Sequence, residues 1–158
     1  MRLYLLRHGL ADWPGWDPAR DDERPLTKAG IAKLRAEARA LERLDLGLDA
    51  ILSSPFARAR ETAEIVAARL GLDVTLEPAL APGFDAKGLR SLLQRHAGAS
   101  ALLLVGHEPD FGRTIGALVG GARIALKKGG LARVDLASVE RPSATLVWLL
   151  APKLLITR

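Results

Sequence analysis

The sequence contains no cysteine, and this absence excludes several kinds of site. Structural disulfides, thiolate nucleophiles and cysteine-based zinc sites all need the missing residue. Aromatic residues make up only 4% of the chain, too few for a surface on which nucleic-acid bases stack. No apolar run approaches the roughly 18 residues that a membrane span requires, so no membrane partner is expected.

The formal net charge is +5, which in principle suits a nucleic-acid binder. The basic residues are nevertheless spread along the chain, and the only adjacent pair of lysines is Lys127-Lys128. No nucleic-acid partner is therefore expected, although a basic nucleic-acid binder stays open as a function of another class. The first residues lead straight into an apolar run without a small-residue cleavage site, so we expect a cytoplasmic protein without a signal peptide.

The length of 158 residues and the hydrophobic fraction of 49% are typical of one globular domain with its own core. No internal repeat or linker divides the chain, so a single domain over residues 1–158 is expected. Apolar runs alternate with helical periodicity, which favours a three-layer α/β/α sandwich with a mostly parallel central sheet. The last two strands, joined by a short loop, suggest an antiparallel hairpin. The predicted strands cover residues 3–9, 49–53, 73–77, 100–105, 131–136 and 144–150, and the predicted helices cover residues 28–46, 56–70, 89–96 and 111–119.

Local signals predict where the helices begin and end. Thr27 is a candidate N-cap for the first helix, and Gly47 is expected to end it. Ser54, which a proline follows, is a candidate N-cap for the second helix, which is expected to stop at Gly71. His96, at the end of the third helix, is expected to be exposed and to have no role.

Residues 10–25 form a long segment without periodicity, and loops of that length are often functional. Trp13 and Trp16 lie in this segment, and Phe84 lies in another irregular one. We expect these three aromatic side chains to form an exposed rim around an open cleft. Such a rim would suit a protein substrate better than a deep pocket would.

Two strongly apolar strands each lead to a histidine. Four apolar residues precede Arg7 and His8, and the apolar run 101–105 precedes His107. Such runs are typical of strands buried on both faces, and ligands of open α/β sheets bind beyond the carboxyl ends of the strands. Arg58 falls in the first turn of the second predicted helix, where the helix dipole disfavours a cation. This local inconsistency is typical of functional sites.

Arg7, His8, Arg58 and His107 together make a candidate phosphate site. The two arginines would neutralise phosphate oxygens, while one histidine attacks phosphorus in line and the other binds the equatorial oxygens. Neither a Walker loop nor a metal-ligand spacing such as HExxH is present. We therefore expect phosphoryl transfer without a metal and without another cofactor, with the arginines as the electrostatic clamp.

Four stretches of the chain occur in the order and approximate spacing of a known family. They are Leu6-Arg7-His8-Gly9, Pro25-Leu26-Thr27, the segment SSPFARARETA at 53–63, and Val105-Gly106-His107-Glu108-Pro109. With these motifs the sequence resembles the histidine phosphatase superfamily, also called phosphoglycerate mutase-like, over nearly its whole length. Within that superfamily it looks most like the SixA-type phosphohistidine phosphatases.

The resemblance implies a phosphoglycerate mutase-like fold and a hydrolase, a phosphatase of the phosphoric monoester hydrolase class. It implies that His8 becomes phosphorylated and that Arg7, Arg58 and His107 bind the phosphoryl group. Water would then cleave the intermediate and release inorganic phosphate. Mutase activity is not expected, because 158 residues leave no room for the insertions that cover the substrate of mutases.

The chain departs from the family pattern at the expected general acid. Many members carry a glutamate after the third strand, where this chain reads Leu80-Ala81-Pro82-Gly83-Phe84. An alkoxide leaving group needs a proton in the transition state, whereas histidine, with an ordinary pKa of about 6.5, is far less basic. The missing acid therefore favours cleavage of P–N over P–O bonds. The carboxylates that could replace it are Glu77, Asp85, Asp21, Asp22 and Glu108.

Three functions within this family remain open. The leading hypothesis is a metal-independent phosphatase that acts on protein phosphohistidine, as on a histidine-containing phosphotransfer domain. The alternative is a small-molecule phosphomonoesterase, which would turn over a sugar or nucleotide phosphate faster than phosphohistidine. A catalytically weak phosphoprotein-binding module is the third, and it predicts phosphate binding without a trapped phosphoenzyme.

Overall fold

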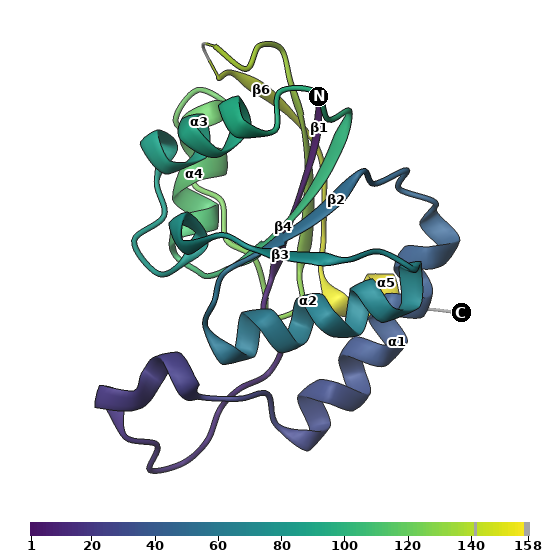
Figure 1. Cartoon of the computed structure of the whole chain (residues 1–158), viewed down its shortest axis with the longest axis vertical. Helices are drawn as coiled ribbons and strands as arrows, with labels where there is room; N and C mark the ends of the chain where they lie inside the picture. Colours follow the sequence, from purple (N-terminus) through teal and green to yellow (C-terminus); the bar gives the residue numbers. More distant parts are fainter. Residues whose placement is uncertain (141, 157–158) are drawn as a thin grey trace.

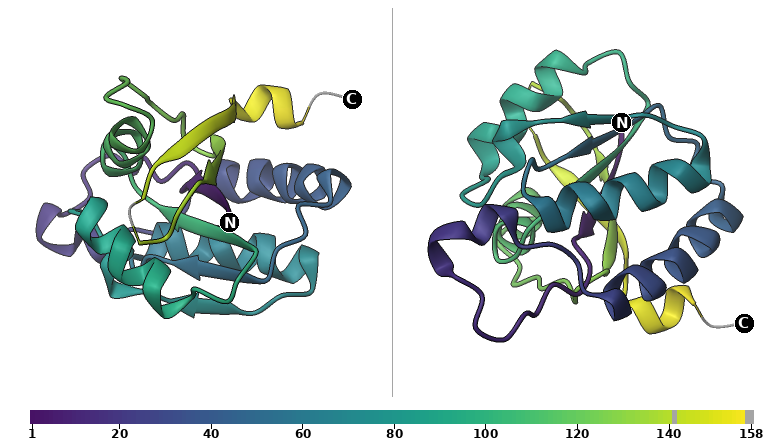
Figure 2. Two further views of the ribbon diagram at one scale, coloured as in Figure 1. Left: turned by 90° about the horizontal axis from the view of Figure 1, so that it is seen from above. Right: turned by 60° about the horizontal axis from the view of Figure 1, so that its bottom comes forward.

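The computed structural model describes residues 1–140 and 142–156. A six-stranded sheet lies between two layers of helices (Figures 1 and 2). The strands are β1 (Arg2–Arg7), β2 (Ala50–Ser53), β3 (Val74–Leu76), β4 (Ala101–Gly106), β5 (Leu131–Leu136) and β6 (Ala144–Leu150). The helices are α1 (Lys28–Leu44), α2 (Ala57–Leu70), α3 (Ala86–Arg95), α4 (Asp110–Leu118) and α5 (Pro152–Leu155), with short 3₁₀ helices η1 (Pro18–Glu23) and η2 (Pro78–Leu80).

The strands follow the order β3-β2-β4-β1-β5-β6 across the sheet. Strands β3, β2, β4 and β1 run parallel to one another, whereas β5 is antiparallel to β1 and β6 is antiparallel to β5. The predicted α/β/α sandwich with a mostly parallel sheet and a C-terminal hairpin is therefore confirmed. The central neighbours β1 and β4 pair with Arg7 opposite Gly106. This register brings the residues that follow both strands to the same edge of the sheet.

Both faces of the sheet are buried, and the side chains of β1 alternate between them. Leu3 and Leu5 pack into the core under α3 and α4, while Tyr4 and Leu6 pack into the core under α1 and α2. All six residues of β4 are buried as well. The buried residues of the two central strands are apolar because a helical layer covers each face of the sheet (Figure 1).

The helix ends agree with the sequence prediction in part. The hydroxyl of Thr27 accepts a hydrogen bond from a backbone N–H of the first turn, as expected of an N-cap. However, α1 ends earlier than the predicted Gly47, because Asp45 takes a left-handed conformation, with φ of 45°, and caps the helix. The prediction that Ser54 caps α2 was wrong. The N-cap residue is Phe56, and the Ser54 hydroxyl instead accepts from the Phe56 N–H at 3.2 Å.

Two side chains expected on the surface are held inside. His96 is half-buried, and its Nε2 lies 3.2 Å from Oε1 of Glu77, so it is neither exposed nor without a partner. Phe84 is buried and packs edge-on against Phe111, with ring centroids 5.9 Å apart. It therefore belongs to the core and forms no rim. No helix within residues 1–140 and 142–156 is long and apolar enough to cross a membrane.

Candidate active site

The end of β1 is fixed on both sides by backbone hydrogen bonds. The N–H of Arg7 donates to the carbonyl of Gly130, and the N–H of His8 donates to the carbonyl of Gly106, both at 3.0 Å. From the opposite direction, the N–H of Gly129 lies 3.1 Å from the carbonyls of both Arg7 and His8. This network positions the two side chains at the carboxyl edge of the sheet before any ligand binds.

His8 is oriented by contacts at both ring nitrogens, Nδ1 with the backbone and Nε2 with Arg58. Its Nδ1 lies 2.7 Å from the carbonyl oxygen of Gly9, which can only accept, so Nδ1 carries the proton and Nε2 carries the lone pair. Burial, together with the charges of Arg58 and Arg7, lowers the pKa of His8 to about 4, although the bond to Gly9 opposes the shift. The imidazole is therefore neutral at pH 7, which is the form a nucleophile needs.

Arg58 reaches the same point from the first turn of α2. Its Nε lies 3.3 Å from Nε2 of His8, its Nη1 donates to the carbonyl of Asp21 at 2.7 Å, and its Nη2 donates to the carboxylate of Asp21 at 3.0 Å. The guanidinium also lies over the Phe56 ring, 5.2 Å from the centroid. The cation is thus held by η1 as well as by its own helix.

His107 faces His8 across the end of the sheet, with ring centroids 5.3 Å apart. Its Nε2 lies 2.8 Å from the hydroxyl of Ser54. Burial, followed by the charges of His8 and Arg58, lowers the pKa of His107 to about 3, so this ring is neutral too. A Ser54 hydroxyl that donates to Nε2 leaves the ring proton on Nδ1. That atom is buried and has no hydrogen-bond partner among residues 1–140 and 142–156, and His107 lines the same cleft as His8.

These four side chains line one cleft of about 500 Å³ at the carboxyl edge of the sheet. The structure thus brings together all four residues that the sequence singled out, although their catalytic roles remain proposals. Other charged residues that line the cleft are the cations Arg24, Arg113 and Lys128 and the carboxylates Asp12, Asp21, Glu108 and Asp110. Within the described part of the chain, no three histidine, aspartate or glutamate side chains are arranged to hold a metal ion.

The carboxylates considered as replacements for the missing acid are mostly committed elsewhere. Glu77 forms an ion pair with Arg95 at 2.6 Å, away from the cleft. Asp85 caps α3, and Asp22 is exposed and does not line the cleft. Of the five carboxylates, only Asp21 and Glu108 line the cleft, and their surroundings differ. Partial burial opposes the shift, but hydrogen bonding to Arg24 and the charge of Arg58 lower the pKa of Asp21, which disfavours a role as proton donor.

The second of these two, Glu108, accepts a hydrogen bond from the N–H of Leu126 at 3.0 Å through Oε1. It therefore helps to hold the segment to which Arg7 is also attached, because Nη1 of Arg7 donates to the carbonyl of Leu126 at 2.8 Å. The cleft therefore combines several cations with two neutral histidines.

Some residues that build the site were not predicted from the sequence. Thr62 accepts from the N–H of Gly9 at 3.1 Å and donates to the carbonyl of Arg58 at 2.7 Å, so it connects the turn after β1 to α2. Ser54 orients His107. Both residues lie inside the SSPFARARETA segment, and no local pattern distinguishes them from surface hydroxyls.

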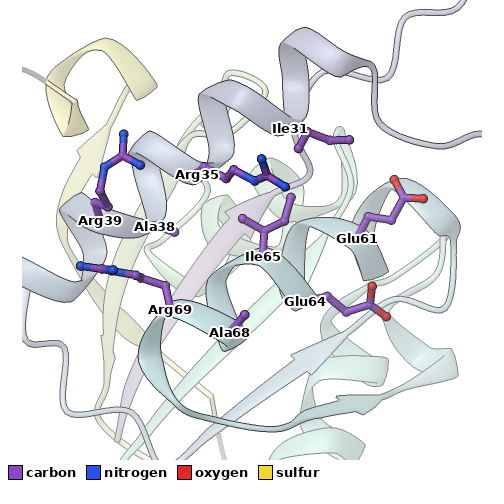
Figure 3. Close-up of a pocket in the computed structure, with 9 residues that line it drawn as sticks. All are labelled: Ile31, Arg35, Ala38, Arg39, Glu61, Glu64, Ile65, Ala68 and Arg69. Carbon is purple, nitrogen blue, oxygen red and sulfur yellow. The ribbon is translucent and has the colours of Figure 1, made fainter.

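A second hollow, of about 550 Å³, lies between α1 and α2 (Figure 3). Its apolar floor includes Ile31 and Ile65, and charged side chains of both helices surround it. None of the four candidate site residues lines it, and among its lining residues there is no histidine, serine or cysteine. The cleft at the end of β1, which has the nucleophile and the cations, is therefore the candidate active site.

Comparison with known proteins connects this geometry with a family. A model described as "Histidine phosphatase superfamily (branch 1)" matches residues 3–82. The phosphohistidine phosphatase SixA of Escherichia coli is 33% identical over 77% of this chain and 76% of its own length. A solved structure of the protein histidine phosphatase SixA with tungstate has 30% identity and a TM-score of 0.84, covering 97% of this chain and 98% of that one. A mycobacterial glucosyl-3-phosphoglycerate phosphatase, 19% identical with a TM-score of 0.74 over 92% of this chain and 96% of its own, shares the fold.

Proposed function

The chain belongs to the histidine phosphatase superfamily and is a phosphatase of the SixA type, and on that basis we propose that it hydrolyses phosphohistidine in proteins through a phosphorylated His8. One observation carries this proposal. His8 presents a neutral Nε2 lone pair, fixed by the bond of Nδ1 to Gly9, in a cleft that also holds Arg7, Arg58 and His107.

The reaction proceeds in two displacements. In the first, the substrate imidazole carries a proton from solvent on its other ring nitrogen, Nε2 of His8 attacks phosphorus, and the P–N bond of the substrate breaks, so that imidazole leaves as a neutral group. In the second, water attacks phosphorus, the P–Nε2 bond of the enzyme breaks, and inorganic phosphate leaves with His8 neutral again. Arg7, Arg58 and the Nδ1–H of His107 stabilise the charge on the equatorial oxygens in both steps.

The substrate class depends on whether a carboxyl group of the cleft can protonate the leaving group. Cations beside Asp12 and Asp21 keep both carboxylates ionised. Glu108 accepts from the N–H of Leu126, and Asp110 accepts from the N–H of Gly83. An alkoxide leaving group would need a strong proton donor, whereas histidine, with an ordinary pKa of about 6.5, leaves far more readily. The name of the E. coli relative, a phosphohistidine phosphatase, supports the same substrate.

The test is single-turnover dephosphorylation of a ³²P-labelled phosphohistidine phosphotransfer protein beside p-nitrophenyl phosphate. Wild-type enzyme should dephosphorylate the protein faster than the ester and should transiently carry acid-labile ³²P. His8→Ala should carry no label. Fast turnover of the ester with slow turnover of the protein would move the substrate to small phosphomonoesters. Phosphate binding without label transfer from either substrate would make the protein a binding module.

A further inference from the structure

A third hollow, distinct from the one between α1 and α2, opens directly beside the cleft that holds His8, which we call the phosphate cleft. It has a volume of about 620 Å³ and shares three lining residues with the cleft, namely Asp12, Asp21 and Arg24. Its remaining walls are Trp13, Pro14, Trp16 and Pro18, all from the segment between β1 and α1 that projects from one end of the molecule in Figures 1 and 2. A group bound in the hollow would therefore be adjacent to a phosphoryl group on His8.

The two tryptophans are held in place by a tight turn. The sequence Trp13-Pro14-Gly15-Trp16 places proline and glycine at the central positions of a type II turn. The N–H of Trp16 lies 3.3 Å from the carbonyl of Trp13, and Gly15 has φ of 72°, as that turn requires. A side chain other than glycine would be strained at this position, so the turn fixes the spacing of the two indoles.

The indole N–H groups are already used within the chain. Nε1 of Trp13 donates to the carbonyl of Pro25 at 2.8 Å, and Nε1 of Trp16 donates to the carbonyl of Arg20 at 2.9 Å. The indoles therefore contribute apolar ring surface to the hollow and no free donor. Trp13 is 40% exposed despite this anchoring, so a large rigid aromatic surface faces solvent.

The charged residues of the hollow are paired as well. Asp12 accepts from Lys128 at 2.6 Å, and Asp21 accepts from both Arg24 and Arg58. Arg24 also donates to the carbonyl of Ala11 at 2.6 Å. Since every polar side chain that lines the hollow has a partner within the chain, the two indoles and the two proline rings are the main unpartnered surface left for a ligand.

We propose that this hollow, bounded by Trp13, Pro14, Trp16 and Pro18 beside the phosphate cleft, receives an apolar side chain of the substrate protein next to its phosphohistidine. The proposal rests on the proposed function and adds the contact that selects a protein over a small phosphate compound. A small ligand would need fixed polar groups to orient it, and the hollow has none to spare. A protein is oriented by its phosphohistidine, so it needs only apolar contact, and tryptophans are the residues that most often dominate such contacts.

The first experiment compares two substrates that share the scissile P–N bond, a phosphohistidine phosphotransfer protein and phosphoramidate. For Trp13→Ala and for Trp16→Ala, the ratio of kcat/KM on the protein to kcat/KM on phosphoramidate should fall about tenfold, mainly through KM, as for other interface tryptophans. The control is Val147→Ala on β6, which removes a side chain 43% exposed and outside both hollows. It should leave the ratio unchanged.

An unchanged ratio in the tryptophan variants would overturn the proposal, and so would an equal fall on both substrates, which would indicate a purely structural loop. With p-nitrophenyl phosphate added as a third substrate, a fall in kcat/KM confined to that ester would assign the hollow to small aromatic esters and overturn the protein occupant. If the wild-type enzyme were inactive on the phosphohistidine protein, the proposed function would be refuted. The proposed occupant of the hollow would then be refuted as well.

A second experiment uses the wild-type protein and needs no variant to fold. The chain has three tryptophans, of which Trp148 packs against Tyr4 with ring centroids 5.9 Å apart and lies outside the hollow. In NMR spectra of ¹⁵N-tryptophan-labelled enzyme, addition of the unphosphorylated phosphotransfer protein should shift the indole signals of Trp13 and Trp16 and leave that of Trp148. Three unmoved signals, or three that move alike, at concentrations that saturate turnover would contradict docking at the hollow.

Discussion

Asp21 holds Arg58 through two oxygen atoms, its carboxylate 3.0 Å from Nη2 and its backbone carbonyl 2.7 Å from Nη1. The carboxylate lies beside the point at which a phosphate oxygen would meet the same guanidinium. A negative charge so close to a phosphate site opposes anion binding, while the carbonyl contact orients the arginine. The two effects can be separated, because only one of them depends on the charge.

Asp21→Asn is therefore expected to tighten the binding of inorganic phosphate. The amide keeps an oxygen that can accept from Arg58, while the repulsion of the bound dianion disappears. At the roughly 1 kcal/mol of two unit charges about 4 Å apart in water, the inhibition constant for phosphate should fall about fivefold. The control is Asp22→Asn, which removes an exposed charge outside the cleft. Weaker phosphate binding in Asp21→Asn would show that the ionised carboxylate is required for positioning.

Arg58→Ala is expected to lower kcat on the phosphohistidine protein by about 10² to 10³, the usual effect of removing one electrostatic donor to a developing charge. Steady-state kinetics beside Arg60→Ala gives a matched control, since Arg60 is exposed in the same helix and pairs with Glu64. Arg60→Ala should retain wild-type kcat. Near-normal activity of Arg58→Ala would remove this arginine from the mechanism.

Gly129→Ala is expected to displace the backbone that positions Arg7 and His8. A β-carbon at Gly129 would lie 2.5 Å from Oε2 of the buried Glu37, and the backbone φ of 75° is already unfavourable for alanine. Both kcat and the free energy of unfolding should fall, because the Gly129 N–H holds the carbonyls of Arg7 and His8. Urea denaturation and kinetics would measure the two effects.

Gly71→Ala is the matched control for that substitution. Gly71 has φ of 68°, but nothing lies within 4 Å of a β-carbon built there. It should lose only the roughly 1–2 kcal/mol of a left-handed alanine and keep its activity. Equal losses of stability and activity in the two variants would mean that the contact with Glu37 has no effect on the site.

Glu37→Gln is expected to stabilise the protein increasingly as the pH rises above about 4.5, and not at pH 4. Burial raises the pKa of Glu37 to about 7, with Lys33 opposing the shift. Because the folded state binds the proton more tightly than the unfolded state, wild-type stability falls as pH rises from about 4.5 to about 7 and then levels off. The glutamine variant lacks this loss, and should be more stable than wild type by about 2–3 kcal/mol at pH 8 and no more stable at pH 4.

Urea denaturation of wild type and Glu37→Gln at the two pH values measures this difference in the free energy of unfolding. The buried histidines titrate in both proteins, so their contribution cancels in the difference. Glu42→Gln provides the comparison, since Glu42 is exposed and paired with Arg69. A difference between Glu37→Gln and wild type that does not change with pH would mean that Glu37 is not protonated on folding.

The sequence predicts the fold and the cluster at the strand ends because both follow from local patterns. The residues Arg7 and His107 stand directly after apolar runs, and parallel strands bring such positions to one edge of the sheet. Asp21 could not be assigned in this way, since its contact with Arg58 joins segments 37 residues apart. Phe84, in an irregular segment, and His96, at the end of α3, were misplaced for a related reason, because their burial depends on distant neighbours that no periodicity reveals.

The position of β1 in the sheet also determines when a growing chain can acquire activity. Both ladder partners of β1, β4 and β5, come from the C-terminal part of the chain, beginning at Ala101. Until those residues have left the ribosome, the strand that carries His8 has no neighbour, and the fold depends on contacts of long sequence separation. Turnover in a nascent chain should therefore begin only after β4 and β5, the second of which ends at Leu136, have emerged from the ribosome.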